Sequence, residues 1–235
     1  MIYRKEMNER SPLRVFENST HGGLGAGNIG VVMSRAGVGK TAFLIGVALD
    51  GLMRGQKVLH VTHGESVEHV RQFYDEVFRE LARSTDLKDA DAARLAMERN
   101  RMIHSYAAGG FDMEKLRQAV DFLKEHVQFQ PEIVILDGFE PAEANEADLT
   151  LLKKFAQDED TELWIPALTH HDGDDADARG VPKTIARFDA WISVMVKLHP
   201  SDGAVTVRIL KDHGNAAVAE LQMKLDPTTL LLLKS

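Results

Sequence analysis

The residues best placed to do chemistry form one short motif. Residues 34–41 read Ser-Arg-Ala-Gly-Val-Gly-Lys-Thr, which matches the phosphate-loop pattern GxxxxGK[ST] except at the first glycine. In such a loop the backbone N–H groups and the lysine hold phosphates, and the hydroxyl binds Mg²⁺. The motif therefore predicts a nucleotide phosphate site, with Lys40 also acting in catalysis. Its candidate residues are Ser34, Arg35, Ala36, Gly37, Val38, Gly39, Lys40, Thr41 and Ala42.

Ser34 is the departure from this pattern. The first position closes the turn between strand and loop and makes no phosphate contact in the mechanism above, so a small serine can replace glycine there. Gly37 and Gly39 stand where the backbone must approach the anion. A chance glycine-rich turn is the alternative, but Lys40, Thr41 and both flanking elements would then all be coincidental.

A carboxylate at the end of a buried strand is the second requirement of a phosphate-loop enzyme, because it helps to hold Mg²⁺. Residues 133–137 read Ile-Val-Ile-Leu-Asp, four aliphatic residues followed by Asp137. We therefore expect Thr41 and Asp137 to share a metal site. The alternative is that this aspartate merely ends a strand.

The elements that must position these residues read as a parallel sheet. Apolar, β-branched runs alternate with helical patterns, which is typical of an α/β fold with helices on both faces of the sheet. The runs lie at residues 28–33, 57–62, 102–106, 132–137 and 163–169. Between them, Ser66 and Asp112 are expected helix N-caps and Gly55 an expected helix end.

The pattern of hydrophobic residues changes from helical to strand-like spacing from residue 189 onward. Three strand-like runs linked by turns predict antiparallel strands that close the sheet. They lie at residues 190–198, 204–211 and 217–225. We expect one domain over residues 21–235, preceded by an N-terminal arm over residues 1–20.

The composition excludes several classes of protein. With 28 Lys+Arg against 36 Asp+Glu the net charge is −8, which does not favour a protein that coats nucleic acid or anionic membranes. Cysteine is absent, so disulfides and thiolate chemistry are excluded. No apolar run reaches the roughly 20 residues of a membrane helix or resembles a signal peptide. We expect a cytoplasmic protein without a membrane partner.

Four stretches, in this order, resemble the RecA-like P-loop ATPases, particularly the branch containing KaiC, RadA and the DnaB-type helicases. They are residues 22–43 with the phosphate loop, 54–66 at the second strand, 131–140 around Asp137 and 168–173 at the tip of the next strand. The resemblance implies a RecA-like domain with ATP and Mg²⁺ as ligands.

In that family a glutamate after the second strand polarises the attacking water, often within a Glu-Glu-Ser run. Here the run is Gly64-Glu65-Ser66, so the resemblance implies Glu65 as the base after a one-residue adjustment beside glycine. The alternative is a first-turn acid favoured by the helix dipole.

The resemblance also places a polar γ-phosphate sensor at the tip of the fifth strand. His170 or Thr169 would fill this role, and a solvated loop histidine is the alternative. His170, His171 and the nearby aspartates make a less favoured metal site, because they are contiguous rather than at helix or strand spacing.

Residues 211–214, Lys-Asp-His-Gly, resemble the family's Lys-x-Arg-Gly turn, whose basic pair reaches the ATP of a neighbouring subunit. The resemblance implies that Lys211 and His213 act in trans within a homo-oligomer such as a hexamer. A largely neutral histidine would stabilise transferring charge less than arginine does. An ordinary hairpin turn is the alternative.

These expectations favour a Mg²⁺-dependent ATPase that acts as an oligomeric regulatory or assembly switch. Because Gly64 and His213 replace residues that accelerate hydrolysis, a nucleotide-binding module with little turnover is the alternative. A DNA-associated motor or recombination-type ATPase is less favoured, since four aspartates in residues 171–178 would repel nucleic acid. A small-molecule kinase is disfavoured because no basic lid segment is apparent.

Overall fold

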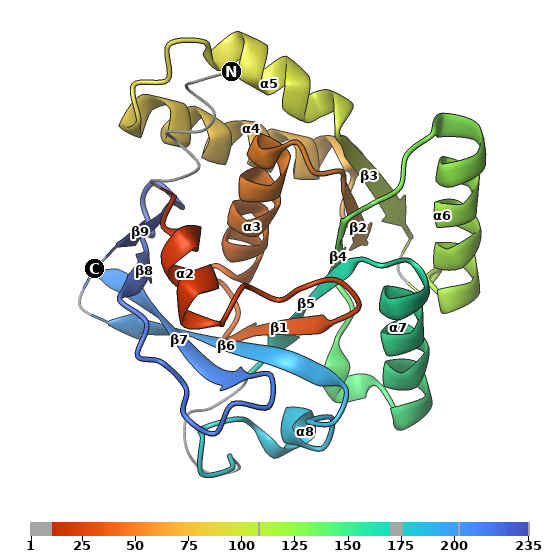
Figure 1. Ribbon diagram of the computed structural model, residues 1–235, viewed down its shortest axis with the longest axis vertical. Coiled ribbons are helices and arrows are strands. Elements are labelled where there is room, and N and C mark those ends of the chain that lie inside the picture. The colour runs from red at the N-terminus through yellow and green to blue at the C-terminus, as the bar shows by residue number, and fades with distance from the viewer. Residues whose placement is uncertain (1–10, 108, 170–175, 202, 235) are drawn as a thin grey trace.

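One sheet runs through the computed structural model, which describes residues 11–107, 109–169, 176–201 and 203–234 (Figure 1). Its strands are β1 (Ile29–Ser34), β2 (Val58–His63), β3 (Arg101–Tyr106), β4 (Ile133–Asp137), β5 (Glu162–Leu168), β6 (Ile192–Ser201), β7 (Ala204–Asp212), β8 (Met223–Leu225) and β9 (Leu232–Lys234). The order across the sheet is β3-β2-β4-β5-β1-β6-β7-β8-β9. Strands β1 to β6 pair in parallel, and β7 to β9 are antiparallel to their neighbours. The expected α/β fold with a mainly parallel sheet and C-terminal antiparallel strands is confirmed.

Helices cover both faces of this sheet. Along β1 and β4, successive side chains enter opposite core clusters, because strand side chains alternate between faces. One face carries α2 (Leu13–Ser19), α3 (Lys40–Arg54), α4 (Val67–Ser84) and α5 (Ala90–Arg99). The other carries α6 (Met113–Val127), the 3₁₀ helix η1 (Pro141–Glu143), α7 (Glu146–Asp158) and α8 (Lys183–Ala186). No helix in the described ranges has the length and hydropathy required to cross a bilayer.

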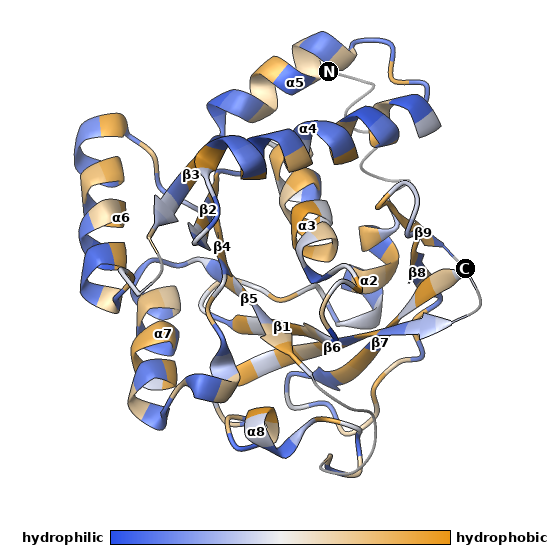
Figure 2. Cartoon of the chain, turned by 180° about the vertical axis from the view of Figure 1, so that it is seen from behind, coloured by the Kyte–Doolittle hydropathy of each residue, from blue (hydrophilic) through white to orange (hydrophobic). Residues whose placement is uncertain are grey.

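Helix α3 follows the phosphate loop and is hydrophobic around most of its surface (Figure 2). It begins after Gly39 and ends at Gly55, both with positive φ. Ser66 caps α4 by accepting a hydrogen bond from His69 N, and Asp112 caps α6 in the same way. The expected helix ends are therefore confirmed, and they follow from local capping chemistry.

Part of the expected N-terminal arm packs on the domain itself. In α2, Leu13 and Phe16 are buried, and the Phe16 ring lies 6.2 Å from Phe43 and 6.0 Å from Trp164 between ring centroids. These contacts join residues 13–19 to the core beneath α3. Residues 1–10 of the arm lie outside the described part of the chain.

The C-terminal strands differ in detail from the prediction. The first run, β6, pairs in parallel with β1 before its antiparallel pairing with β7. The third run forms a strand only over Met223–Leu225, because residues 214–220 are exposed and outside the ladder. Strand β9 was not predicted, since its Leu-rich sequence has no alternating pattern.

Candidate functional site

The loop after β1 contains two glycines in the left-handed region of the backbone. Gly37 and Gly39 have φ values of 74° and 115°, a region that residues with a side chain rarely adopt. A Cβ atom at Gly39 would also lie 2.4 Å from Leu225 Cδ2. The positive φ therefore favours glycine at position 39, and a side chain there would also force the Leu225 methyl group of β8 to shift.

Ser34 closes the turn between β1 and the loop. It is 1% exposed, its hydroxyl donates to the Arg35 carbonyl at 3.0 Å, and its own carbonyl accepts a hydrogen bond from Thr169 N at 3.0 Å. The serine thus sits in a small, hydrogen-bonded position at the base of the loop. These contacts explain how the loop keeps its shape without the first glycine of the motif.

The Lys40 ammonium folds back over the loop. Its Nζ donates to the carbonyls of Ser34 at 3.1 Å and Arg35 at 3.2 Å. Burial lowers the pKa of Lys40, whereas the charges of Glu140 and Asp137 raise it. An arriving phosphate would replace the two carbonyls as the partner of this ammonium.

Thr41 and Asp137 meet at the same edge of the sheet, although they are far apart in the sequence. Thr41 Oγ1 donates to Asp137 Oδ2 at 3.1 Å. Burial raises the pKa of Asp137 and the nearby Glu65 charge acts in the same direction, while hydrogen bonds from Thr41 and Gly138 oppose the shift. A hydroxyl and a carboxylate oxygen side by side are suitable ligands for Mg²⁺, so these two residues can hold that ion.

Glu65 lies beyond the end of β2, on the same sheet edge. Its side chain is 61% exposed, and Oε2 is 3.8 Å from His69 Nε2. Gly64 has φ 79°, a conformation that favours glycine, and its N–H donates to the Tyr106 carbonyl at 2.9 Å. The charge of Glu65, the expected base, raises the pKa of Asp137. The exposure of its side chain places Glu65 on the solvent side of the site.

The expected sensor is only partly within the described residues. Thr169 is 6% exposed and joins the loop through its N–H bond to Ser34 O. His170 lies outside the described residues, as does most of the alternative metal cluster. Elsewhere in the described chain, no group of His, Asp or Glu side chains is arranged to hold a metal ion.

Lys211 and His213 are not brought to the phosphate loop of their own chain. Lys211 Nζ is 2.9 Å from Asp189 Oδ2, and the His213 ring lies between Asp212 Oδ1 at 2.8 Å and the Leu24 carbonyl at 3.0 Å. Strand register pairs Lys211 with Met195 and Met195 with Val31. The turn therefore lies toward the amino end of β1, whereas the loop follows its carboxyl end.

Two residues at the site were not predicted from the sequence. Glu140 holds the chain after β4 against β5, because its carboxylate accepts hydrogen bonds from Leu168 N at 2.9 Å and Ala142 N at 3.1 Å. Its charge also acts on Lys40. The available signal was its position three residues after Asp137.

His60 is the second residue that was missed. It is fully buried in β2, with Nδ1 3.0 Å from the Tyr74 hydroxyl and Nε2 3.9 Å from Asp137 Oδ2. Burial and the Arg101 charge lower the pKa of His60 to about 3, so the ring is neutral at pH 7. The signal was a histidine in the middle of an otherwise apolar strand.

No family model matches the chain, and no curated protein is significantly similar to it.

Proposed function

We propose that this chain binds ATP with Mg²⁺ through residues 34–42 and Asp137, as a RecA-like P-loop ATPase. The contact that carries the proposal is the 3.1 Å hydrogen bond between Thr41 Oγ1 and Asp137 Oδ2. It joins the two expected metal ligands directly beside a loop with two positive-φ glycines. The choice of ATP over other nucleotides rests on the resemblance of the motifs.

The start of α3 adds a second argument for an anion. Gly39 provides no side-chain cap, and the first turn of α3 contains no acidic residue. The first N–H groups of a helix lack intrahelical partners and carry the positive end of its dipole. A phosphate at this position would satisfy these donors, and Lys40 would add a positive charge.

For hydrolysis, Glu65 is the proposed base and His170 or Thr169 the proposed γ-phosphate sensor. Lys211 and His213 would complete the site from a neighbouring subunit, in a homo-oligomer that works as a regulatory or assembly switch. Because Glu65 is 61% exposed and both basic residues contact their own chain, a nucleotide-binding module with little turnover is the second candidate.

The steady-state ATPase rate separates the two candidates. For an ATPase, we expect Glu65→Gln to lower the rate by about 100-fold or more, because it removes the general base. Glu68→Gln is the matched control, since Glu68 is 60% exposed on the first turn of α4. Equal, near-zero rates in the wild type and both variants would support the binding module and rule out the enzyme.

A further inference from the structure

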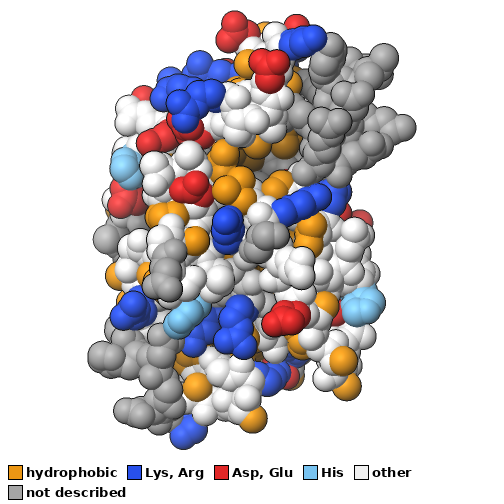
Figure 3. All heavy atoms as spheres, turned by 90° about the vertical axis from the view of Figure 1, so that its left-hand side faces the viewer, with side chains coloured by type: hydrophobic (Ala, Val, Ile, Leu, Met, Phe, Trp, Pro, Cys, Tyr) orange, Lys and Arg blue, Asp and Glu red, His pale blue; other side chains and the backbone are white. Residues whose placement is uncertain are grey.

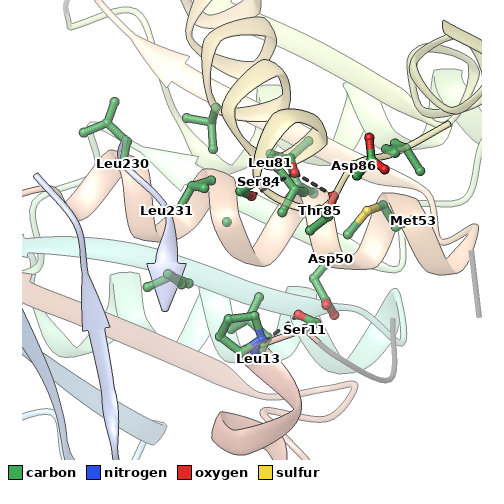
Figure 4. A pocket seen from close by; sticks show the side chains of 16 residues that line it. Ser11, Leu13, Asp50, Met53, Leu81, Ser84, Thr85, Asp86, Leu230 and Leu231 are labelled. Carbon is green, nitrogen blue, oxygen red and sulfur yellow. Dashed lines mark hydrogen bonds between the residues drawn. The ribbon is translucent and has the colours of Figure 1, made fainter. Parts of the chain in front are cut away.

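A cavity of about 470 Å³ lies beside the second half of α3. Its walls come from the start of α2, from α3, from the end of α4 and from the segment that leads into β9 (Figure 4). Hydrophobic side chains gather on this side of the molecule below α4 and α5 (Figure 3). No residue of the phosphate loop, nor Asp137, lines the cavity, so the cavity is separate from the proposed nucleotide site.

The cavity is mainly apolar. Its volume lies within the range of about 300–1,000 Å³ that is common for small-molecule sites. Nine of its lining residues have aliphatic or thioether side chains, namely Leu13, Leu49, Met53, Val77, Leu81, Leu87, Leu230, Leu231 and Leu232. An apolar ligand body would therefore gain affinity by leaving water.

Asp50 is the charged residue that α3 contributes to the lining. Its side chain is 3% exposed, and Oδ2 contacts both Arg14 and Arg54. Oδ1 has less than 1 Å² of accessible surface, so this carboxylate is part of the wall and does not offer an oxygen to the cavity.

The end of α4 presents acceptors to the cavity. The Ser84 hydroxyl donates to the Leu81 carbonyl at 2.9 Å, so its hydrogen is directed at that carbonyl. Asp86 follows beside Thr85 (Figure 4). The negative end of the α4 dipole lies here as well, so this side of the cavity favours a cation with several donors.

We propose that the cavity binds a small amphipathic molecule with an apolar body and an ammonium head. The aliphatic lining would hold the body. The ammonium, which has three donors and no acceptor, would lie at the end of α4 beside the oxygens of Asp86 and Ser84. This site goes beyond the proposed ATP site and does not depend on it.

Calorimetric titration with alkylamines tests this proposal on the full chain. The probes are hexylamine, octylamine and decylamine below their aggregation concentrations, with octanoate as the anion of equal length. We expect one octylamine per chain, affinity that rises roughly fourfold per added methylene until the cavity is full, and at least tenfold weaker binding of octanoate.

Two variants locate the ligand. Asp86→Asn should weaken octylamine binding about two- to fivefold, as expected for an exposed ion pair, and asparagine tolerates the positive φ of 50° at this position. Asp121→Asn, an exposed change on α6, is the matched control and should leave affinity unchanged. Ser84→Phe should abolish binding by filling the cavity.

The proposal would be overturned if none of the three alkylamines bound to the wild type. Equal affinity for octanoate and octylamine would also overturn it, as would unchanged binding by folded Ser84→Phe. If Ser84→Phe does not fold, the chain-length series on the wild type decides, and affinity that is independent of chain length would contradict the site.

Discussion

His60 places a titratable group in the core next to the proposed metal ligand. Its pKa falls to about 3 on burial, whereas a histidine in the unfolded chain titrates near 6.5. Between these pH values the unfolded chain holds a proton that the folded chain does not. The contribution of His60 to the free energy of unfolding therefore decreases as the pH falls from about 6.5 toward 3.

We expect His60→Leu to remove this contribution to the pH dependence. Between pH 6.5 and 5.5 the free energy of unfolding of the wild type should fall by about 1 kcal/mol more than that of the variant. Urea denaturation at both pH values measures the difference. His126→Leu, at a 61% exposed position, should retain the wild-type dependence. A His60→Leu protein with the same pH dependence as the wild type would show that His60 titrates normally.

At this scale, the sequence predicted the positions of those residues of the proposed site that belong to a local motif. Lys40 and Thr41 have their positions fixed by neighbouring glycines, and Asp137 by the end of its strand. His60 and Glu140 could not be assigned in the same way, because their roles depend on partners that the fold brings together. The contacts from His60 to Tyr74 and Asp137 join separate elements of the sheet and helices.

Among the elements, α3 depends on a positive-φ glycine at each end, but for different reasons. Gly55 has φ 91°, and a Cβ atom at this position would have no neighbour within 4 Å. Gly39 has φ 115°, and a Cβ atom there would contact Leu225. Gly55→Ala should lower the free energy of unfolding by about 1–2 kcal/mol through backbone strain alone and leave ATP affinity unchanged. Gly39→Ala should weaken ATP binding at least tenfold, because alanine strains the positive φ of the loop and displaces the Leu225 side chain packed against it.

Urea denaturation and ATP titration of the two glycine variants provide the comparison. Wild-type ATP affinity in Gly39→Ala would contradict the claim that the loop shape at residue 39 holds phosphate. Loss of ATP binding in Gly55→Ala would mean that a disturbance anywhere along α3 abolishes binding, so that the effect of Gly39→Ala would not be specific to the loop.

The short helix α2 also makes a prediction at the element scale. Phe16 is 3% exposed and contacts Phe43 and Trp164, so Phe16→Ala should lower the free energy of unfolding by about 3–5 kcal/mol. Asn18→Ala, at an exposed position of the same helix, should change it by less than about 0.5 kcal/mol. Urea denaturation measures both. Equal free energies of unfolding for the wild type and Phe16→Ala would show that α2 does not stabilise the core.

Element types were more predictable than their limits and partners. Alternating strands and helices up to β5 carry strong local patterns, and caps such as Ser66 and Asp112 mark helix starts. Strand β9 and the short extent of β8 were missed because tertiary pairing, rather than local sequence, decides which of these residues form strands. The burial of Phe16 was missed for the same reason, since a polar segment gave no sign of its contact with Trp164.

For the whole molecule, the proposed trans-acting turn predicts complementation between subunits. Lys211→Ala would retain an intact phosphate loop but offer no basic residue at position 211 to its neighbour. Lys40→Ala would have the opposite defect. We expect each variant alone to be at least tenfold less active than the wild type, and a mixture of the two to regain ATPase activity. No recovery in a mixture shown by light scattering to co-assemble would contradict action in trans.

The proposed binding of ATP by residues 34–42 is most directly tested by calorimetric titration with ATP, with and without Mg²⁺. The proteins are the wild type, Lys40→Ala and the control Lys154→Ala, which changes a 62% exposed lysine on α7. We expect the wild type and Lys154→Ala to bind ATP more tightly with Mg²⁺ than without it, and Lys40→Ala to lose binding. Equal ATP affinity in Lys40→Ala and wild type, or no binding by the wild type, would contradict the nucleotide site.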